Sequence, residues 1–264
     1  MRDLLFPTRR ALVAGALGGA AATALPASAP ARGAAPFTAA AVEGPYYLDV
    51  GQMRAEIAEG RPGVPLEIAF AIRDEAGAPF DSARIDVWHC DALGRYSGFP
   101  GQGDDGKLDL RGETFLRGTQ LADAEGRVGF ASVYPGWYPG RTAHVHFKVI
   151  DGATTRLTSQ FFLPDAVSEY LYLNVSAYRR DRLRDTLNAT DGIALAAGET
   201  VHAELREIAR GYRVFLEVKV DRTTTRSDER RGFAAPPGLP FGGPPRRAPL
   251  EGAERVRAIA PSAG

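Results

Sequence analysis

Residues 135–148 have the sequence PGWYPGRTAHVHFK, in which a loop rich in glycine and proline runs directly into an alternating stretch. In a β-strand, side chains two residues apart point to the same face. A strand over 143–150 would therefore place His144 and His146 side by side, while the apolar residues between them would face the core. The segment predicts a half-buried strand that presents two imidazoles on one face.

Alternating apolar residues indicate further strands on both sides of this one, and turn residues separate them at short intervals. Many short strands with this spacing predict an all-β domain, an antiparallel β-sandwich core with long loops. A barrel is the nearest alternative. A helical turn or two is expected within 167–187. The expected strands cover residues 66–72, 127–133, 143–150, 160–163, 201–208 and 212–220, and a further strand runs from residue 83 to the turn at 93–94.

The N-terminal end of the 264-residue chain has the pattern of an export signal. Two arginines at positions 9–10 precede an apolar stretch over 11–25 and a triplet of small residues at 27–29, as in a twin-arginine signal peptide and its cleavage site. We therefore expect a signal peptide over 1–29, a linker over 30–40 and an exported protein, periplasmic or extracellular. A retained N-terminal anchor is the alternative. No other stretch is apolar and long enough to span a membrane, so no stable membrane insertion is expected after cleavage.

The C-terminal end also differs from the middle of the chain. Residues 223–264 are rich in proline, glycine and arginine. Such a segment buries too little apolar area to offset the entropy of ordering it. We expect a mostly disordered tail there, and a single folded domain over 41–222, which is large enough to bury its own core.

The charges and the single cysteine exclude some classes of function. There are 32 basic and 32 acidic residues, so the formal net charge is zero and no nucleic-acid partner is predicted. Cys90 is the one cysteine, so the chain has no internal disulfide framework. It falls in an expected strand, where a buried, inert thiol is more typical than a nucleophile with a lowered pKa.

Two tyrosines in loops accompany the histidine pair. Tyr138 lies in the loop before His144, and Tyr96 lies in a second loop, Gly-Arg-Tyr-Ser-Gly over 94–98. Alone, a His-x-His strand can simply present polar residues to solvent, and a tyrosine is usually a half-buried aromatic. Loops on a rigid scaffold often carry functional residues, however. The combination therefore favours a metal site.

At this point the sequence resembles a known family, the intradiol ring-cleavage dioxygenases, which include protocatechuate and catechol dioxygenases. The resemblance extends from Glu43 to the last expected strand, about two thirds of the chain. The blocks that carry it are EGPYY at 43–47, DVWHCDALGRYS at 86–97, FLRG at 115–118, PGWYPGRTAHVHFK at 135–148 and SQFF at 159–162.

The resemblance implies a mononuclear ferric iron, Fe(III), as the cofactor, held by two tyrosinates and two histidines. These residue types suit that ion, because hard, highly charged cations favour anionic oxygen ligands and imidazole binds iron broadly. Tyrosine binds as phenolate only beside a strong positive charge, since its free pKa is about 10. By the match, the ligands are Tyr96, Tyr138, His144 and His146.

The resemblance also implies the reaction. A family member inserts both atoms of O₂ into a small-molecule catechol and cleaves the bond between the two hydroxylated carbons, giving a muconate-type diacid. The substrate displaces one tyrosinate, which by the match is Tyr138. Arg141 matches an arginine that stabilises developing negative charge, and Gln160 matches a glutamine near the substrate. By analogy, the residues lining the substrate pocket are Glu43, Gly44, Pro45, Tyr46, Trp137 and Arg141.

Some of these positions could also have a purely structural role. Residues 43–47 could be an ordinary loop, and Trp137 could merely pack. His89 matches no ligand position and is expected to be a hydrogen-bonded core histidine or a residue behind the ligands. The loop between Tyr138 and Arg141 is shorter than in the protocatechuate enzymes. The long helical region of catechol dioxygenases is absent, so a dimer through such helices is not expected, and the oligomeric state is left open.

Two other classes of function remain as alternatives. One is a zinc hydrolase in which His144, His146 and a carboxylate such as Asp91 bind the metal, because three protein ligands and an open water position are a common zinc arrangement. The other is a non-catalytic β-sandwich binding module. Ferric tyrosinate is coloured and zinc is colourless, so the colour of the protein separates the first alternative from the iron enzyme.

Overall fold

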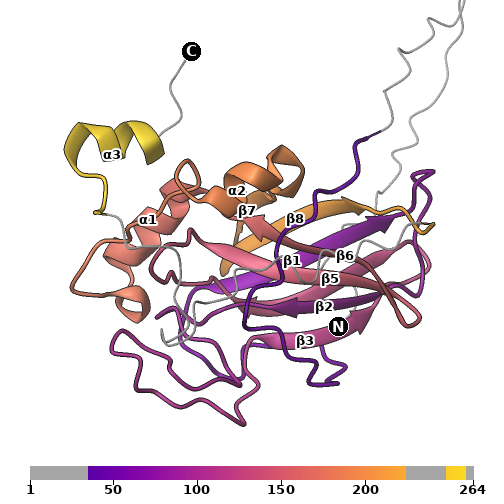
Figure 1. Cartoon of the computed structure of the whole chain (residues 1–264), viewed down its shortest axis with the longest axis horizontal. Coiled ribbons are helices and arrows are strands. Elements are labelled where there is room, and N and C mark those ends of the chain that lie inside the picture. Colours follow the sequence, from indigo (N-terminus) through magenta and orange to yellow (C-terminus); the bar gives the residue numbers. More distant parts are fainter. Residues whose placement is uncertain (1–34, 224–247, 260–264) are drawn as a thin grey trace, which may run out of the picture.

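The computed structural model describes residues 35–223 and 248–259, and these form a β-sandwich (Figure 1). One sheet has the strand order β4-β1-β8-β7 and the other has the order β3-β2-β5-β6. The predicted all-β sandwich is therefore confirmed. The strands are β1 Pro65–Arg73, β2 Arg84–Trp88, β3 Arg117–Leu121, β4 Arg127–Val133, β5 His144–Asp151, β6 Thr154–Phe162, β7 Glu204–Ile208 and β8 Gly211–Lys219.

The strand pairing departs from the expectation at one place. Strand β1 pairs with β8 in parallel, while its other neighbour, β4, and the remaining strand pairs of the described chain are antiparallel. The parallel pair joins the first and last strands of the domain. Alternation of side chains shows which residues share a face but not the direction of the neighbouring strand, so the sequence could not predict it.

The core lies between the two sheets and is built by the inward faces of the strands. Phe70 of β1 packs on Phe147 of β5, with ring centroids 5.3 Å apart. The opposite face of β5 carries His144, His146 and Lys148, and these too are at most 5% exposed. Strand β5 is therefore buried on both faces. The N-terminal segment and several long loops cover its outer side.

Two strands differ clearly from those that the sequence predicts. Strand β3, with the sequence RGTQL, was not expected, since it shows no apolar alternation. Strand β6 is longer than the predicted 160–163, and its first half is polar. Both strands belong to the sheet that carries the histidines, whose outer face is built with polar side chains.

Short helices fill the connections at one end of the sandwich. Helix α1, Asp165–Asn174, and a 3-10 helix at Ser176–Tyr178 fall within the segment where helical turns were expected. Helix α2, Gly192–Ala197, was not expected, and a second 3-10 helix, Glu199–Val201, follows it.

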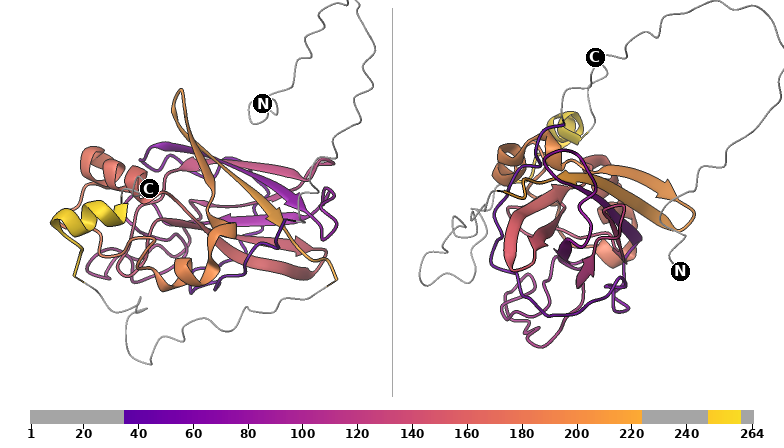
Figure 2. Two further views of the ribbon diagram at one scale, coloured as in Figure 1. Left: turned by 90° about the horizontal axis from the view of Figure 1, so that it is seen from above. Right: turned by 90° about the vertical axis from the view of Figure 1, so that its right-hand side faces the viewer.

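A further helix, α3, lies within the segment that was expected to form a disordered tail. It spans Gly252–Ile259 and contacts α1 at the same end of the sandwich (Figure 2). Its Arg255 is 7% exposed and forms two 2.8 Å hydrogen bonds with the carboxylate of Glu169. The composition of 223–264 did not predict this helix.

The other expectations for the chain ends are only partly covered by the structure. The signal peptide over 1–29 and residues 224–247 and 260–264 of the tail lie outside the described residues. Of the expected linker, residues 35–40 are described, and they pack along the sandwich through hydrogen bonds from Thr38 N to Lys219 O and from Ser159 Oγ to Ala39 O. Within the described ranges, no helix combines the length and the apolar character needed to cross a bilayer.

His89 is the core histidine that the sequence predicts. It is 1% exposed, and its Nδ1 and Nε2 lie 2.8 Å from the Cys90 carbonyl and 2.7 Å from the Ser132 hydroxyl. A carbonyl only accepts, so Nδ1 carries the proton and Nε2 accepts from the serine. This arrangement holds a neutral imidazole, and burial lowers the pKa of His89 from 6.5 to about 4.

This buried histidine makes a prediction about acid stability. As the pH falls through 6.5, the unfolded chain binds a proton at His89 that the folded chain does not, so the contribution is complete above pH 6.5 and declines towards pH 4. Its loss at pH 4 is about 3 kcal/mol. We expect His89→Gln to lose less stability than the unsubstituted protein over this interval in urea titrations of the iron-free chain. Parallel losses in the two proteins would contradict the assignment.

Candidate metal centre

The two loop tyrosines and the two strand histidines converge at the start of β5. The hydroxyl oxygens of Tyr138 and Tyr96 lie 3.1 Å and 3.4 Å from Nε2 of His144. The imidazole rings of His144 and His146 are 4.9 Å apart between centroids. Thus the structure brings together four residues that the sequence analysis selected from separate segments.

The spacing and chemistry of these donors fit a metal ion. Donor atoms that share one first-row metal at bond lengths of about 2.1 Å stand roughly 3 to 3.4 Å apart, which is the spacing of the tyrosine oxygens from His144 Nε2. His146 Nδ1 is buried and has no hydrogen-bond partner. Within the described part of the chain, no three residues among His, Cys, Asp and Glu are grouped to hold a metal, so the two tyrosines are needed to complete a ligand set.

Burial sets the protonation states of these ligands. Desolvation is the largest cause that raises the pKa of Tyr96 and of Tyr138, and Arg141 opposes it for both. Desolvation, reinforced by the charge of Arg141, lowers the pKa of His144 to about 3, and the pKa of His146 is also well below its ordinary value. Both imidazoles are therefore neutral, as metal ligands must be. The tyrosines would ionise only beside a bound cation.

The tautomer of His144 leaves a lone pair directed at the tyrosines. Its Nδ1 lies 2.6 Å from the backbone carbonyl of Thr142, which can only accept a hydrogen bond. Nδ1 therefore carries the proton, and the unprotonated Nε2 faces the Tyr96 and Tyr138 hydroxyls. A carbonyl that fixes the orientation of a histidine in this way is common behind metal ligands.

Close backbone contact joins the two tyrosine loops. Gly94, at φ +78°, lies so near the Trp137 carbonyl oxygen that an added Cβ would come within 2.1 Å of it. Gly136 N also donates to the Asp91 carbonyl at 3.0 Å. The Tyr96 and Tyr138 loops therefore form one unit, which fixes the distance between the two phenol oxygens.

Arg141 and Gln160 adjoin the four predicted ligands. Nη1 of Arg141 lies 3.5 Å from the Tyr138 hydroxyl and 3.4 Å from His144 Nε2. Nη2 donates to the Gln160 side-chain oxygen, and Gln160 Nε2 in turn donates to the Val42 carbonyl at 2.6 Å. The whole of Arg141 is 5% exposed, so its charge acts in a site from which water is largely excluded.

A family model described as "Dioxygenase" matches residues 42–203, which is more than half of the chain. The chain belongs to the intradiol ring-cleavage dioxygenase family. The match covers the described sandwich from the segment before β1 to the start of β7.

Individual relatives agree with this assignment. The chain is 35% identical over 143 residues to a chlorocatechol 1,2-dioxygenase of Pseudomonas sp. (strain P51), covering 46% of this chain and 54% of that protein. It is 32% identical over 159 residues to the protocatechuate 3,4-dioxygenase beta chain of Burkholderia cepacia, covering 54% of this chain and 66% of that protein. The chain thus spans between about half and two thirds of the length of these curated relatives.

A solved structure shows the same fold. The intradiol ring-cleavage dioxygenase from Tetranychus urticae superposes with a TM-score of 0.67 over 73% of this chain and 98% of that chain, at 24% sequence identity. At this level of sequence identity, the structural similarity shows that the two chains share a fold. It gives no information about the substrate of this chain.

The segment Glu43–Tyr47, which was predicted to line the substrate pocket, lies against Tyr96 and His146. The ring of Tyr46 stacks on Tyr96, with centroids 4.3 Å apart, and a Cβ on Gly44 would lie 3.4 Å from His146. Glu43 forms a 2.6 Å ion pair with Lys148, two residues beyond His146 on β5. Pro45 is exposed at the outer side of this segment.

The Glu43–Lys148 pair holds this covering segment in place, which gives a second prediction. We expect Glu43→Gln to loosen the segment while leaving all four predicted ligands intact. The KM for a catechol should rise about threefold to tenfold, corresponding to about 1 kcal/mol for a half-buried pair, with iron content unchanged. Steady-state oxygen uptake together with metal analysis measures both. A loss of iron would show instead that the pair supports the ligands themselves.

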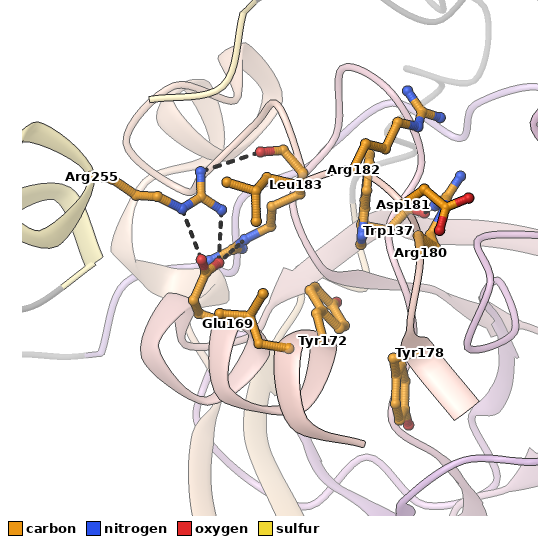
Figure 3. Close-up of a pocket in the computed structure, with 11 residues that line it drawn as sticks. Trp137, Glu169, Tyr172, Tyr178, Arg180, Asp181, Arg182, Leu183 and Arg255 are labelled. Atoms are coloured by element: carbon orange, nitrogen blue, oxygen red, sulfur yellow. Dashed lines mark hydrogen bonds and ion pairs between the residues drawn. The ribbon is translucent and has the colours of Figure 1, made fainter. Parts of the chain in front are cut away.

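The Trp137 ring packs against two arginines, and its place in the substrate pocket stays a prediction. Its ring lies 4.2 Å from the Arg180 guanidinium and 5.0 Å from that of Arg182. It lines a separate cavity of about 160 Å³ beside Tyr172 (Figure 3). Consecutive residues in an extended loop point to opposite sides, so Tyr138 faces the centre and Trp137 packs away from it.

Two residues at the centre were missed by the sequence analysis. Trp88 of β2 stacks on His146, with centroids 4.8 Å apart and ring planes 14° apart. Asp191 pairs with Arg141 at 2.9 Å. The sequence signal for Asp191 was an Asp-Gly pair before an apolar run, which is a helix-start pattern. Trp88 gave no signal beyond the match of its strand to the family.

Proposed function

We propose that this family member is a non-haem iron enzyme that inserts both atoms of O₂ into a catechol and cleaves the bond between its hydroxylated carbons, giving a muconate-type diacid. The observation that carries the proposal is the approach of the Tyr96 and Tyr138 oxygens to within 3.4 Å of His144 Nε2, with Nε2 unprotonated. Membership of the intradiol family implies non-haem iron, and the donor set of two tyrosines and two histidines suits that ion. The proposed Fe(III) ligands are Tyr96, Tyr138, His144 and His146.

When bound, ferric iron would withdraw electron density from a catecholate, so that the ring reacts with O₂. One protein ligand has to be displaced when the substrate binds, and Tyr138 is the ligand best placed for this. It is partly exposed, whereas Tyr96 is 1% exposed and lies beneath Tyr46. Once it is displaced, the Tyr138 phenolate oxygen can take a proton from a substrate hydroxyl.

Arg141 and Gln160 complete the proposed machinery. Arg141 Nη1 faces the Tyr138 hydroxyl, so it stabilises negative charge on the released tyrosinate or on the reacting ring. Gln160 accepts a hydrogen bond from Nη2 of the same guanidinium and itself donates to the Val42 carbonyl, directly before the segment Glu43–Tyr47. Both residues are at most 5% exposed, which strengthens these interactions by excluding water.

The proposed substrate class is a single-ring catechol, and the proposed location is outside the cytoplasm. Relatives carry the names chlorocatechol, catechol, hydroxyquinol and protocatechuate dioxygenase, so a panel of these rings is the natural test. The twin-arginine pattern at 9–10 supports export with the metal already in place. Immunodetection of the chain in separated periplasmic, culture and cytoplasmic fractions tests that location.

The zinc alternative is disfavoured by where Asp91 lies. Its Oδ1 accepts hydrogen bonds from the Leu93 and Arg95 amides, and its Oδ2 pairs with Arg61. This carboxylate shapes the turn before Tyr96 and makes no contact with the histidine pair.

Oxygen uptake by the purified protein tests the proposal. With iron bound, we expect a coloured protein that consumes O₂ with at least one catechol of the panel. A colourless protein that is fully active with zinc would refute the iron site. An iron-loaded, coloured protein that consumed no O₂ with any of these rings would instead support the binding-module alternative.

A further inference from the structure

We propose that Asp191, the residue before α2, is a positioning residue for Arg141, which it holds so that a single guanidinium nitrogen faces the reacting centre. This inference rests on the proposed function, in which Arg141 stabilises negative charge. It adds a residue that neither the sequence pattern nor the likeness to intradiol enzymes selected.

The three nitrogens of Arg141 have separate partners. Nε donates to Asp191 Oδ2 at 2.9 Å, and Nη2 donates to the Gln160 side-chain oxygen. Only Nη1 approaches the Tyr138 hydroxyl and His144 Nε2. A guanidinium is a rigid planar group, so fixing two of its nitrogens determines where the third points.

The ion pair between Arg141 and Asp191 is buried, which makes its loss costly. The side chains of Arg141 and Asp191 are 6% and 1% exposed. Breaking a buried pair by removing one charge leaves the other uncompensated, which is far costlier than losing a surface pair. Without the Asp191 carboxylate, the guanidinium would keep Gln160 as its remaining anchor and could turn about that contact, moving Nη1 from Tyr138.

The two carboxylate oxygens of Asp191 have different hydrogen-bond partners. The positioning of Arg141 can therefore be tested separately from the capping of α2. Oδ1 accepts from the amides of Ile193 and Ala194 and thereby starts α2. Oδ2 accepts from Arg141 Nε and from the Thr142 amide at 3.0 Å. Asparagine and serine both cap helices well, so Asp191→Asn and Asp191→Ser keep the start of α2 while removing the charge that holds Arg141.

The experiment compares these variants with a matched control. In the iron-loaded protein we expect Asp191→Asn to lower kcat about 10- to 100-fold, with KM changed less than about threefold. This loss is smaller than the roughly 100- to 1,000-fold cost of removing a charge-stabilising donor outright, because Arg141 remains present but displaced. The visible tyrosinate-to-iron band should shift, because Nη1 leaves the Tyr138 oxygen. Asp165→Asn removes another buried carboxylate, paired with Arg184 at 2.6 Å near the start of α1. It should lower the thermal midpoint comparably and leave the band in place.

A double-mutant cycle decides whether Asp191 acts through Arg141. In an Arg141→Gln background, Asp191→Asn should lower kcat by less than about twofold and leave the band position unchanged, since residues that act as a unit are not additive. Equal effects in both backgrounds would overturn the inference. Asp191→Ser repeats the cycle if the asparagine variant folds poorly. If the unsubstituted protein consumed no O₂, the proposed function would fail, while the band positions of the cycle would still decide the positioning role.

Discussion

His144→Ala is expected to release the iron and abolish the visible band. The neutral Nε2 of His144 lies within 3.4 Å of both tyrosine oxygens, so its removal deletes a ligand that adjoins two others. Loss of groups that only orient a ligand typically costs 10- to 100-fold in metal affinity, and loss of the ligand itself should cost at least about 100-fold. Iron content after dialysis, measured per chain, checks this.

Substitutions at the tyrosines should separate their two roles. Tyr96→Phe removes the buried ligand and is expected to lose iron or its colour. Tyr138→Phe should keep substantial iron, because Tyr138 is the ligand that yields to substrate, but bind and turn over catechols poorly. His202→Ala changes an exposed histidine that follows the second 3-10 helix and is none of the proposed ligands. It is the control and should keep both iron and activity. Normal activity in all of the Tyr96, Tyr138 and His144 variants would refute the ligand assignment.

Gly94→Ala is expected to separate the two tyrosine loops. The substitution places a Cβ about 2.1 Å from the Trp137 carbonyl oxygen, at a backbone φ of +78° that L side chains rarely adopt. The left-handed backbone costs about 1 kcal/mol and the overlap about 1 to 3 kcal/mol more. We therefore expect the free energy of unfolding of the iron-free chain to fall by about 2 to 4 kcal/mol, and iron binding to weaken because Tyr96 and Tyr138 move apart.

Gly77→Ala is the matched control for this prediction. Gly77 has a φ of +83°, and an added Cβ would meet nothing within 4 Å. It should lose only about 1 kcal/mol, the backbone part of the effect, and should bind iron normally. Urea titration and metal analysis of both variants give the comparison. Equal losses in the two would show that the contact between the loops is not tight.

The sandwich was predictable because most of its strands alternate. Strand β1 has four inward apolar residues in register, and β5 carries the histidines on the face opposite its core residues. Strand β3 was missed because its outer face is polar and because Gly118 has no side chain. The Ile57 side chain fills the space that a side chain at position 118 would occupy. The parallel β1–β8 pair and helix α3 depend on contacts between distant segments, which no local pattern contains.

The part of the site that could be predicted is the part whose residues lie in one short segment of the sequence. Residues 138–146 contain two predicted ligands from the strand, one from the loop, and Arg141 between them. Adjacency in sequence to Tyr138 does not show which way the Trp137 side chain points, and its ring packs against Arg180 and Arg182. Asp191 and Trp88 were missed because each reaches the centre only through tertiary packing, against Arg141 and His146.

The most direct test of the account is the mass of the product that the iron-loaded protein forms from catechol under ¹⁸O₂. The proposed reaction predicts a muconate-type diacid in which each new carboxyl group carries one labelled oxygen, because both atoms of one O₂ enter at the cleaved bond. A product with one labelled atom or none, or an aldehyde formed by cleavage beside the hydroxylated carbons, would contradict it.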